Sequence, residues 1–200
     1  MKQDPRAPRS PHPDPLPLRG RGSTSIETAR LTLRPFTPAD VDDLLSMDGD
    51  ARVMRYIGAN GGARSRDEVV GAIGRIIEFA ANHPGMSLLH AGERTTGRFV
   101  GGCGLFPVPD GSAVELAYRL PYACWGRGYA TEMARAVLAH GFHALGLVRI
   151  VGLTYPENVP SQRVLLKIGM RDEGEAEHYE RTMRVFAAER TGARSAKVVQ

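Results

Sequence analysis

The stretch Trp125-Gly126-Arg127-Gly128-Tyr129-Ala130-Thr131-Glu132 decides how this chain of 200 residues is interpreted. Two glycines flank a basic residue directly before a helical pattern, so backbone N–H groups lie uncovered at the positive end of a helix dipole. Such a turn suits a phosphate or pyrophosphate, although Gly-x-Gly before a helix also occurs in loops that bind nothing. The stretch lacks the third glycine of a dinucleotide-binding fingerprint and the Gly-Lys-Ser/Thr of a Walker loop.

The flanking segments place this turn between a strand and a helix. A strand-like run over residues 113–120 precedes it and ends at Pro121. After the turn, apolar residues recur at helical spacing and predict a helix over about 129–145; they are Ala130, Met133, Ala134, Val137, Leu138, Gly141, Phe142 and Leu145. The order strand, glycine-rich turn, helix favours a nucleotide-like cofactor, and therefore an enzyme.

Composition and charge narrow the class of protein. A length of 200 residues with 42% hydrophobic content predicts one domain with a sizeable core. The pI of about 9.3 is weak evidence for nucleic-acid binding, because residues 1–25 contribute +3 and residues 189–200 contribute +2 to the net charge of +4. Cys103 and Cys124 lack metal-ligand spacing and predict packing residues in a reducing cytosol.

The termini and the membrane signals predict a cytoplasmic protein. No apolar run approaches the roughly 20 residues of a membrane span, and the N-terminus lacks the apolar core of a signal peptide. Six prolines between Pro5 and Pro17 predict a disordered tail over residues 1–24, either a basic arm, an inert extension or the product of a start placed too far upstream. Residues 191–200 are predicted to be flexible.

The body of the chain, residues 25–190, predicts a mixed α/β domain with antiparallel strands first and a strand–helix–strand unit later. Besides the elements above, we expect strands over 28–34, 86–91, 98–108, 148–154, 170–176 and 182–188, and helices beginning at Thr37-Pro38 and spanning 66–82 and 158–168. Ser65 and Glu68 predict a capping box. The helix over 66–82 is expected to bury Val69, Val70, Ile73, Ile76, Ile77 and Ala80.

Three further features are interpreted as structural. Asp42-Asp43 is predicted to be a solvated helix face, and Gly101-Gly102-Cys103-Gly104 a strand with either a close backbone approach or a bulge. His140 and His143 lie three residues apart on a helix without an evident third ligand, so no metal site is expected.

Four segments resemble the GCN5-related N-acetyltransferases, and the branch that includes the ribosomal-protein N-terminal alanine acetyltransferases most of all. They are residues 28–36, 53–58, 115–132 and 157–170, and the last two, in this order and at this spacing, are the most specific. The resemblance covers about residues 27–188. It implies a GNAT-like fold, with a mixed central sheet of about six to seven strands and about four helices. Trp125 departs from the Gln or Arg that is common in the wider family.

The resemblance implies an N-acetyltransferase that moves the acetyl group of acetyl-CoA to a primary amine by direct attack in a ternary complex, without a metal. The acceptor is a protein N-terminus or a small-molecule amine, and the short segment after His178 leaves its identity open. The pyrophosphate is assigned to the turn, which comprises Gly126, Arg127, Gly128, Tyr129, Ala130 and Thr131. The pantetheine arm is assigned to an open strand edge at Tyr118 to Leu120 and to Asn158, with a backbone N–H near Leu120 polarising the thioester.

Three side chains are the candidate catalytic groups. Glu115 is the candidate general base, acting through water. The Ser161 hydroxyl is expected near the CoA sulfur, where it stabilises or protonates the departing thiolate, and Tyr155 is a second candidate acid. Each also has a plain structural interpretation: Glu115 as an edge-strand carboxylate, Ser161 as a first-turn serine and Asn158 as a helix N-cap.

Two other functions remain open at this point. A non-catalytic acyl-CoA-binding or sensing module has the same fold, although intact Glu115, Asn158 and Ser161 argue against it. A longer-chain acyltransferase differs only in the depth of its pocket. The sequence predicts no nucleic-acid or membrane partner, and it leaves a monomer and a homodimer equally open.

Overall fold

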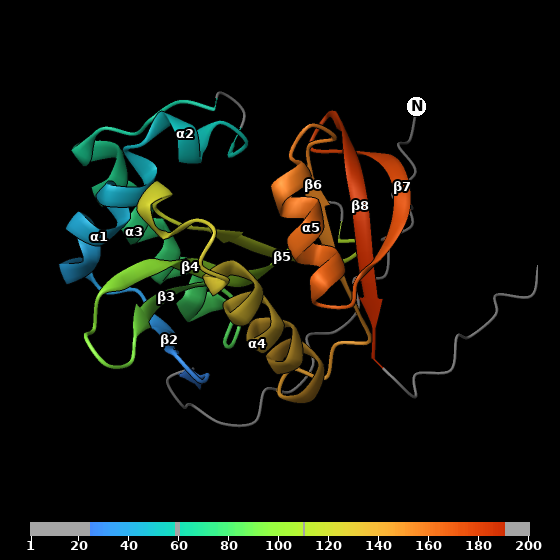
Figure 1. The fold of residues 1–200 in the computed structure, drawn as a ribbon, viewed down its shortest axis with the longest axis horizontal. Helices are drawn as coiled ribbons and strands as arrows, with labels where there is room; N and C mark the ends of the chain where they lie inside the picture. Colours follow the sequence, from blue (N-terminus) through green and yellow to red (C-terminus); the bar gives the residue numbers. More distant parts are fainter. Residues whose placement is uncertain (1–24, 59–60, 110, 191–200) are drawn as a thin grey trace, which may run out of the picture.

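The computed structural model describes residues 25–58, 61–109 and 111–190, so the predictions for residues 1–24 and 191–200 lie outside the described residues. An eight-stranded sheet runs through the described part in the order β1-β2-β3-β4-β5-β6-β8-β7 (Figure 1). Its strands are β1 (Ile26–Glu27), β2 (Leu31–Pro35), β3 (Leu88–Glu93), β4 (Phe99–Pro107), β5 (Val114–Arg119), β6 (Arg149–Thr154), β7 (Arg171–His178) and β8 (Arg181–Glu189). The helices are η1 (Pro38–Asp40), α1 (Val41–Asp48), α2 (Ala51–Met54), α3 (Arg66–Asn82), η2 (Tyr122–Cys124), α4 (Tyr129–His143) and α5 (Val159–Lys167).

The sheet changes character between β5 and β6. Every other neighbouring pair of strands is antiparallel, whereas β5 and β6 run parallel and pair at one position, Glu115 opposite Val151. Beyond that position, residues 116–118 and 153–155 line a cavity instead of pairing with each other. The sheet therefore opens at its centre, on the C-terminal side of both strands, and Figure 1 shows the two halves diverging there.

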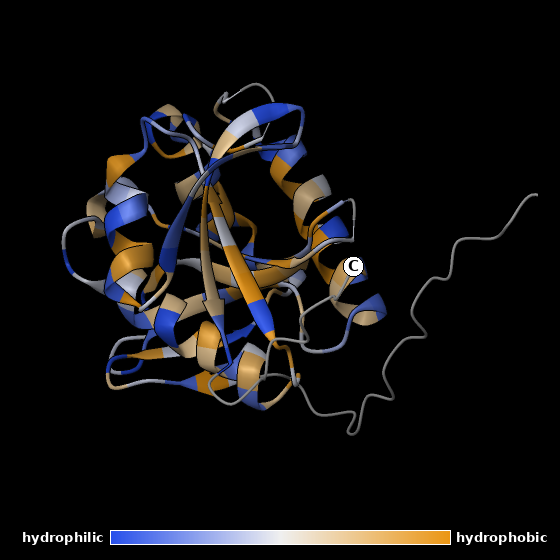
Figure 2. Cartoon of the chain, turned by 90° about the vertical axis from the view of Figure 1, so that its right-hand side faces the viewer, coloured by the Kyte–Doolittle hydropathy of each residue, from blue (hydrophilic) through white to orange (hydrophobic). Residues whose placement is uncertain are grey.

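Helices cover both faces of the sheet and enclose the two larger of three clusters of buried hydrophobic residues. Buried residues of α1, α2 and α3, among them Leu44, Val53 and Val69, pack with Phe36 and Phe99 in one core. The other core joins α4 and α5 to the opposite face. Figure 2 shows hydrophobic residues concentrated in the central strands and hydrophilic residues on the outer surfaces. This burial is the main favourable contribution to folding.

The close backbone approach expected for the glycines of β4 is confirmed. A Cβ atom added to Gly104 would lie 1.8 Å from the carbonyl oxygen of Ser87, and one added to Gly101 would lie 2.6 Å from that of Arg119. Glycine is therefore required where β4 passes its neighbours. Cys103, in the same strand, and Cys124 are free and buried in the core, as expected for packing residues.

The helix α3 has the predicted bounds, and its capping box is present. Glu68 N–H donates to Ser65 Oγ at 3.3 Å, and Ser65 N–H donates to Glu68 Oε2 at 2.7 Å. The expectation that Val70 is buried is wrong, because its side chain is 51% exposed. Val69 and Ala72 face the core instead, since consecutive helical residues point about 100° apart.

The structure has one or two more strands and one more α-helix than expected. The first strand, expected over 28–34, is interrupted, because Thr28 Oγ1 accepts a hydrogen bond from Leu31 N–H and donates to Glu132. Ile26–Glu27 and Leu31–Pro35 therefore form two antiparallel strands. The additional helix α2 is a single turn that begins after Asp50, whose carboxylate accepts from Arg52 N–H.

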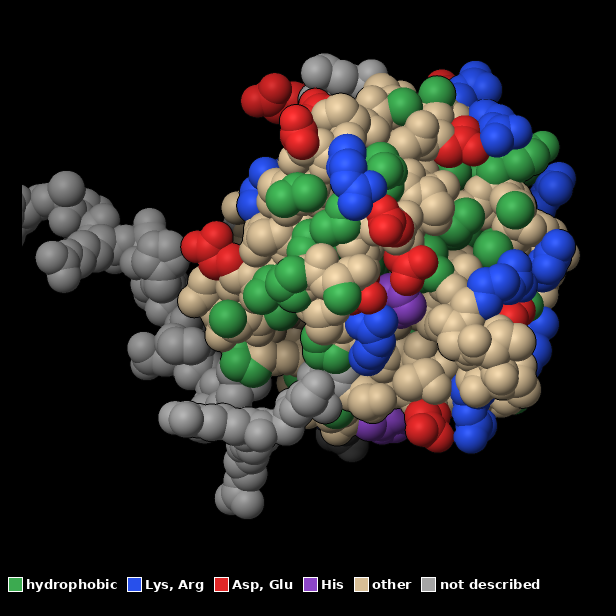
Figure 3. Space-filling view, turned by 90° about the vertical axis from the view of Figure 1, so that its left-hand side faces the viewer, with side chains coloured by type: hydrophobic (Ala, Val, Ile, Leu, Met, Phe, Trp, Pro, Cys, Tyr) green, Lys and Arg blue, Asp and Glu red, His purple; other side chains and the backbone are tan. Residues whose placement is uncertain are grey.

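The helices and one face of the surface bear on the expected partners. Among the described residues, no helix has both the length and the apolar character needed to cross a bilayer. On the face shown in Figure 3, basic and acidic side chains are interspersed.

Candidate functional site

A cavity of about 390 Å³ lies where β5 and β6 diverge. Its walls come from residues 56–58 after α2, residues 115–118 of β5, the end of β6 with the start of α5, and the β7–β8 hairpin. The three candidate catalytic residues Glu115, Tyr155 and Ser161 all line it, as do Tyr118 and Asn158. Residues that lie more than 100 positions apart in the sequence thus line the same cavity.

The glycine-rich turn has the geometry that its sequence predicts. Gly126 and Gly128 have φ angles of 73° and 78°, in the left-handed region that glycine adopts without steric cost. Gly128 is the N-cap of α4, and a Cβ atom at Gly126 would meet no atom within 4 Å. The first N–H groups of a helix lack intrahelical acceptors, so the turn presents an open cradle of donors, with Arg127 exposed beside it.

Arg30 and Glu132 fasten this turn to the N-terminal strands. Arg30 Nε donates to Glu132 Oε2 at 2.6 Å, and Arg30 Nη1 donates to the carbonyl oxygen of Arg127 at 3.1 Å. Thr28 Oγ1 also donates to Glu132 at 2.6 Å. Partial burial acts to raise the pKa of Glu132, but the hydrogen bonds from Thr28 and Arg30 outweigh it and lower that pKa. The turn is therefore held in shape without a ligand.

Of the six residues assigned to the turn, Tyr129 uses its side chain elsewhere. The ring is buried, and its hydroxyl donates to Glu93, which also pairs with Arg98. Hydrogen bonds from Arg98, Tyr129 and Thr96 lower the pKa of Glu93 to about 2. Tyr129 therefore faces the turn with its backbone, while its side chain anchors α4 to β3.

Two contacts that sequence reasoning missed fix the end of β5. Trp125 Nε1 donates to the carbonyl oxygen of Leu120 at 2.9 Å, which explains a tryptophan at this position. The carboxylate of Asp48, fully buried, accepts from Arg119 Nε at 2.7 Å and from Arg64 Nη1 at 2.8 Å. The charge of Asp48 is thus matched by two guanidinium groups, as a buried carboxylate requires.

Tyr118, Ser161 and Asn158 form a connected group on the β5 and α5 sides of the cavity. The hydroxyl groups of Tyr118 and Ser161 are 2.9 Å apart, and Tyr118 Oη lies 3.0 Å from the Ser161 carbonyl oxygen. Burial raises the pKa of Tyr118 above its ordinary value, so the phenol stays protonated. Asn158 Oδ1 accepts from Ser161 N–H at 3.4 Å, which makes Asn158 the N-cap of α5, as its plain interpretation predicts.

Glu115 accepts a hydrogen bond from a residue that the sequence did not single out. Tyr179 Oη, at the tip of the β7–β8 hairpin, donates to Glu115 Oε2 at 2.5 Å. Burial raises the pKa of Glu115, and the hydrogen bond from Tyr179 opposes that rise. Glu115 is therefore a carboxylate with a raised proton affinity facing a cavity, as a general base needs to be.

Tyr155 belongs to a row of contacting side chains at one side of the cavity, which we call the ladder and which comprises Arg55, Tyr56, Tyr155 and Arg181. Its hydroxyl accepts from Arg181 Nη1 at 3.0 Å, and its ring lies 5.7 Å from the ring of Tyr56. The Arg55 guanidinium lies 5.2 Å from the Tyr56 ring on the other side. The ladder joins the segment after α2 to the β7–β8 hairpin, two regions that no sequence motif connects.

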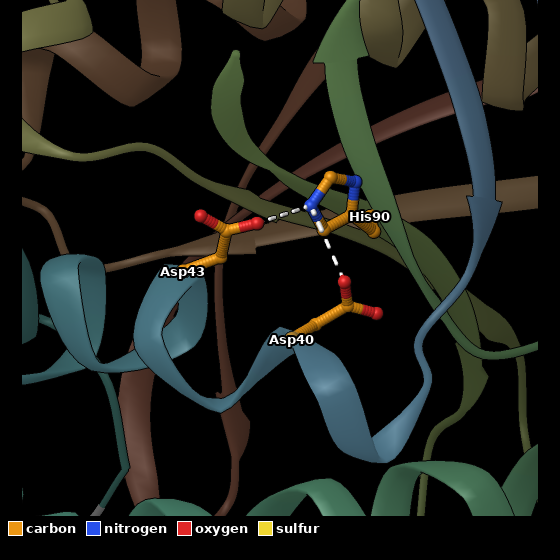
Figure 4. A group of neighbouring side chains, drawn as sticks. All are labelled: Asp40, Asp43 and His90. Carbon is orange, nitrogen blue, oxygen red and sulfur yellow. Dashed lines mark hydrogen bonds and ion pairs between the residues drawn. The ribbon is translucent and has the colours of Figure 1, made fainter. Parts of the chain in front are cut away.

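A histidine and two carboxylates meet outside the cavity, and they correct one prediction. Asp43 is not a purely solvated residue, because its carboxylate lies 2.9 Å from Nε2 of the buried His90 (Figure 4). Asp40 lies 3.9 Å from the same nitrogen. The Asp40 carboxylate accepts hydrogen bonds from both Nη atoms of Arg34 and from Thr37. These hydrogen bonds explain the position of the Asp40 carboxylate, so no metal ion has to be invoked.

His140 and His143 do not belong to any group of metal-ligating side chains among the described residues. His140 Nε2 lies 3.3 Å from the carbonyl oxygen of Gly85, and burial lowers the pKa of His140. Its contact with Gly85 supports the structural interpretation.

Comparisons with known proteins agree with this architecture. The family model described as "Acetyltransferase (GNAT) domain" matches residues 30–171. The chain is 31% identical over 157 residues to the uncharacterized N-acetyltransferase YoaA of Bacillus subtilis, covering 77% of this chain and 86% of that protein. A GNAT-family acetyltransferase from Bacillus anthracis has a similar structure, with 26% identity and a TM-score of 0.71, covering 83% and 98% of the two chains.

The fold also resembles that of a ribosomal-protein acetyltransferase. The structure of RimL, a ribosomal L7/L12 alpha-N-protein acetyltransferase in complex with coenzyme A, aligns with a TM-score of 0.69 and 16% identity, covering 83% of this chain and 98% of that one. At this level of identity the likeness concerns the fold alone.

Proposed function

The chain belongs to the acetyltransferase (GNAT) family, and we propose that residues 25–190 transfer the acetyl group of acetyl-CoA to a primary amine by direct attack in a ternary complex. One observation carries the proposal. β5 and β6 part after the pair Glu115 and Val151, which exposes a strand edge between the glycine-rich turn and a cavity that contains a carboxylate. When bound, acetyl-CoA supplies the acetyl group as a thioester, which an amine converts into an amide while the thiol leaves.

The residues of the turn fit a pyrophosphate. The N–H groups of residues 126–131 would hold it, because the open space over Gly126 leaves room for phosphate oxygens and the Arg30 guanidinium lies 3.5 Å from the place of a Cβ atom at Gly128. Arg127 adds a positive charge there. The edge of β5 from Tyr118 to Leu120 would pair with the amides of the pantetheine arm in the manner of an added strand, with Asn158 across the gap.

Different side chains of the cavity have different roles in the proposed reaction. Glu115 takes a proton from the acceptor amine, directly or through water, because only the neutral amine is a nucleophile. The Leu120 N–H is the proposed donor to the thioester oxygen. Ser161 is the proposed hydrogen-bond donor that stabilises the departing thiolate, which then takes its proton from solvent, and the Tyr118 hydroxyl, 2.9 Å away, orients Ser161. Tyr155, which accepts from Arg181, is the alternative donor.

The acceptor is proposed to be a protein N-terminus or a small-molecule amine. The resemblance in fold to a ribosomal-protein acetyltransferase supports the first, and the cavity of about 390 Å³ is also large enough for a small molecule. The ladder of Tyr56 and Tyr155 at the cavity wall is where the group that carries the amine would rest.

A ligand-stability measurement tests the cofactor site first. We expect acetyl-CoA to raise the midpoint of heat denaturation, since a ligand at 100 times its dissociation constant stabilises a protein by about 2.7 kcal/mol. The variant Gly128→Glu places a carboxylate in the phosphate cradle and should abolish the rise. A well-folded wild-type protein without any rise would overturn the proposal.

Thiol release tests the reaction itself. Peptides with free N-termini and small amines are screened with acetyl-CoA, and we expect release of the CoA thiol that depends on the amine. A clear thermal shift without thiol release from any amine would instead support a non-catalytic acyl-CoA-binding module of the same fold.

A further inference from the structure

The tip of the β7–β8 hairpin is built from residues that are unfavourable for its backbone. His178 pairs with Arg181, so the turn has two central residues, Tyr179 and Glu180, with φ angles of 54° and 59°. Two-residue hairpin turns with positive φ at both positions favour Asn-Gly or Gly-Gly, because a Cβ atom is disfavoured there. A tyrosine at the first position suggests that its side chain has a task which outweighs the backbone cost.

That side chain reaches the candidate base. The Tyr179 hydroxyl donates to Glu115 Oε2 at 2.5 Å, and both residues line the cavity between β5 and β6. The two residues are 64 positions apart in the sequence. The bond therefore joins the hairpin to the strand that borders the cofactor edge.

We propose that Tyr179 is a positioning residue for acetyl transfer: its phenol fixes the Glu115 carboxylate toward the acceptor and stabilises the negative charge on it. This inference rests on the proposed function, in which Glu115 accepts the proton of the amine. It goes beyond that function because it assigns to the β7–β8 hairpin the control of the base.

The surroundings of Glu115 single out this bond. Within the described residues, Tyr179 is the one side chain that hydrogen-bonds to the Glu115 carboxylate. The residues that pair with Glu115 across the sheet, Phe106 on β4 and Val151 on β6, are apolar.

The other groups that could influence the charge of Glu115 have partners of their own. Tyr118 contacts Ser161, while Arg181 donates to Tyr155, whose ring lies against that of Tyr56. Burial raises the pKa of Glu115 and the Tyr179 hydroxyl opposes the rise. Removal of that hydroxyl alone should therefore leave burial unopposed.

The variant Tyr179→Phe isolates the hydroxyl, because the ring that lines the cavity remains. We expect the carbon-13 signal of the Glu115 side-chain carboxyl, assigned with Glu115→Gln, to titrate at a higher pH in Tyr179→Phe than in the wild-type protein. The rise of kcat/KM with pH should move upward by the same amount, which makes the variant about tenfold less active below that rise.

Tyr122→Phe makes the same chemical change on an exposed tyrosine outside the cavity, and it should change neither curve. A Glu115 titration that is identical in the wild-type protein and in Tyr179→Phe would overturn the inference, whether or not the protein acetylates an amine. A shifted titration in a wild-type protein that acetylates nothing would leave the contact established and overturn the proposed function instead. Tyr179→Ala removes the ring as well as the hydroxyl. A pH profile like that of Tyr179→Phe would show that the ring adds nothing to the effect, which then belongs to the hydroxyl, as proposed.

Discussion

Two short bends of the described chain, at residues 126–128 and 179–180, each contain two positive φ angles, and they are made in opposite ways. The turn at Gly126 and Gly128 uses glycines, which adopt this conformation without cost. The hairpin tip uses Tyr179 and Glu180, which adopt it against their preference. The difference indicates what each bend is for. The first presents its backbone, and any side chain would obstruct it. The second presents a side chain, and the backbone accepts strain to place it.

The same contrast separates the two halves of the proposed site. The cofactor half, by which we mean the glycine turn and the start of α4, is a local device, because its residues are adjacent in sequence and are fastened by Arg30, Glu132 and Thr28. The acceptor half is assembled from four places far apart in the sequence. Variants in the first half should therefore change acetyl-CoA binding, and variants in the second should change catalysis.

The largest effect is expected from replacing Glu115, the proposed general base in the acceptor half. Glu115→Gln should lower kcat/KM for the amine by about 10²–10⁴-fold, because a positioned general base contributes that much, while the acetyl-CoA dissociation constant stays the same. In the wild-type protein, kcat/KM should rise with pH, since the base must be deprotonated. The rise should lie above the ordinary range of a glutamate, because burial raises the pKa of Glu115.

Glu175→Gln, on the exposed strand β7, is the matched control for Glu115→Gln and should leave kcat/KM within about twofold. An equal loss of acetyl-CoA binding and of turnover in Glu115→Gln would break the division between the two halves.

The next effect concerns the free energy of unfolding and the ion pairs that hold the end of β5, the strand that both halves share. Asp48→Ala should destabilise the protein by about 3–5 kcal/mol, because it leaves Arg119 and Arg64 without the buried carboxylate that matches them. Arg119 ends β5, the strand that borders both the turn and the cavity. Asp42→Ala removes an exposed partner of Arg66 and should cost less than about 1 kcal/mol. Urea denaturation of both variants checks the comparison, and similar losses would contradict it.

Local patterns in the sequence were enough to predict the backbone geometry of the glycine turn and the adjoining helix start, whereas the binding of acetyl-CoA there stays a prediction. The capping box of α3, the start of α4 at Tyr129 and the glycine turn depend on neighbours within a few residues, so their patterns are visible in the sequence. The opening between β5 and β6 also followed, but through the resemblance to a known family. Prediction from local pattern succeeded where the physics is local.

The acceptor half could not be predicted in the same way. The bond between Tyr179 and Glu115 spans 64 residues, and that between Arg119 and Asp48 spans 71. An isolated charged or aromatic residue in the sequence carries no sign of its distant partner. The same reason explains the error at Asp43, where the helical pattern predicted a solvated face and the buried His90 lies against the carboxylate.

A smaller effect is expected from adding one methyl group to the cofactor turn. Gly128→Ala forces a Cβ atom into the left-handed region at a cost of about 1–2 kcal/mol. We expect the variant turn to leave this conformation to relieve the strain, and acetyl-CoA, which has to restore it on binding, should bind about 5- to 30-fold more weakly. Calorimetric titration of acetyl-CoA measures this, with Ala136→Gly in the middle of α4 as a control that changes helix stability without touching the turn. Unchanged affinity would mean that the turn does not need glycine geometry to bind its ligand.

The smallest effect should have the opposite sign, and it tests the hairpin side of the comparison. Glu180→Gly removes a Cβ atom from a residue with a φ of 59°, which relieves strain but adds freedom to the unfolded chain. We expect a net stabilisation of about 0.5–1 kcal/mol, seen as a higher Tm. Glu177→Gly, within the strand β7, should instead destabilise by a similar amount, since glycine there gains nothing. Because Glu180 has no part in the proposed chemistry, Glu180→Gly should keep the Tyr179 contact and full activity. If activity fell although the fold became more stable, the strain at the tip would itself serve to press Tyr179 against Glu115.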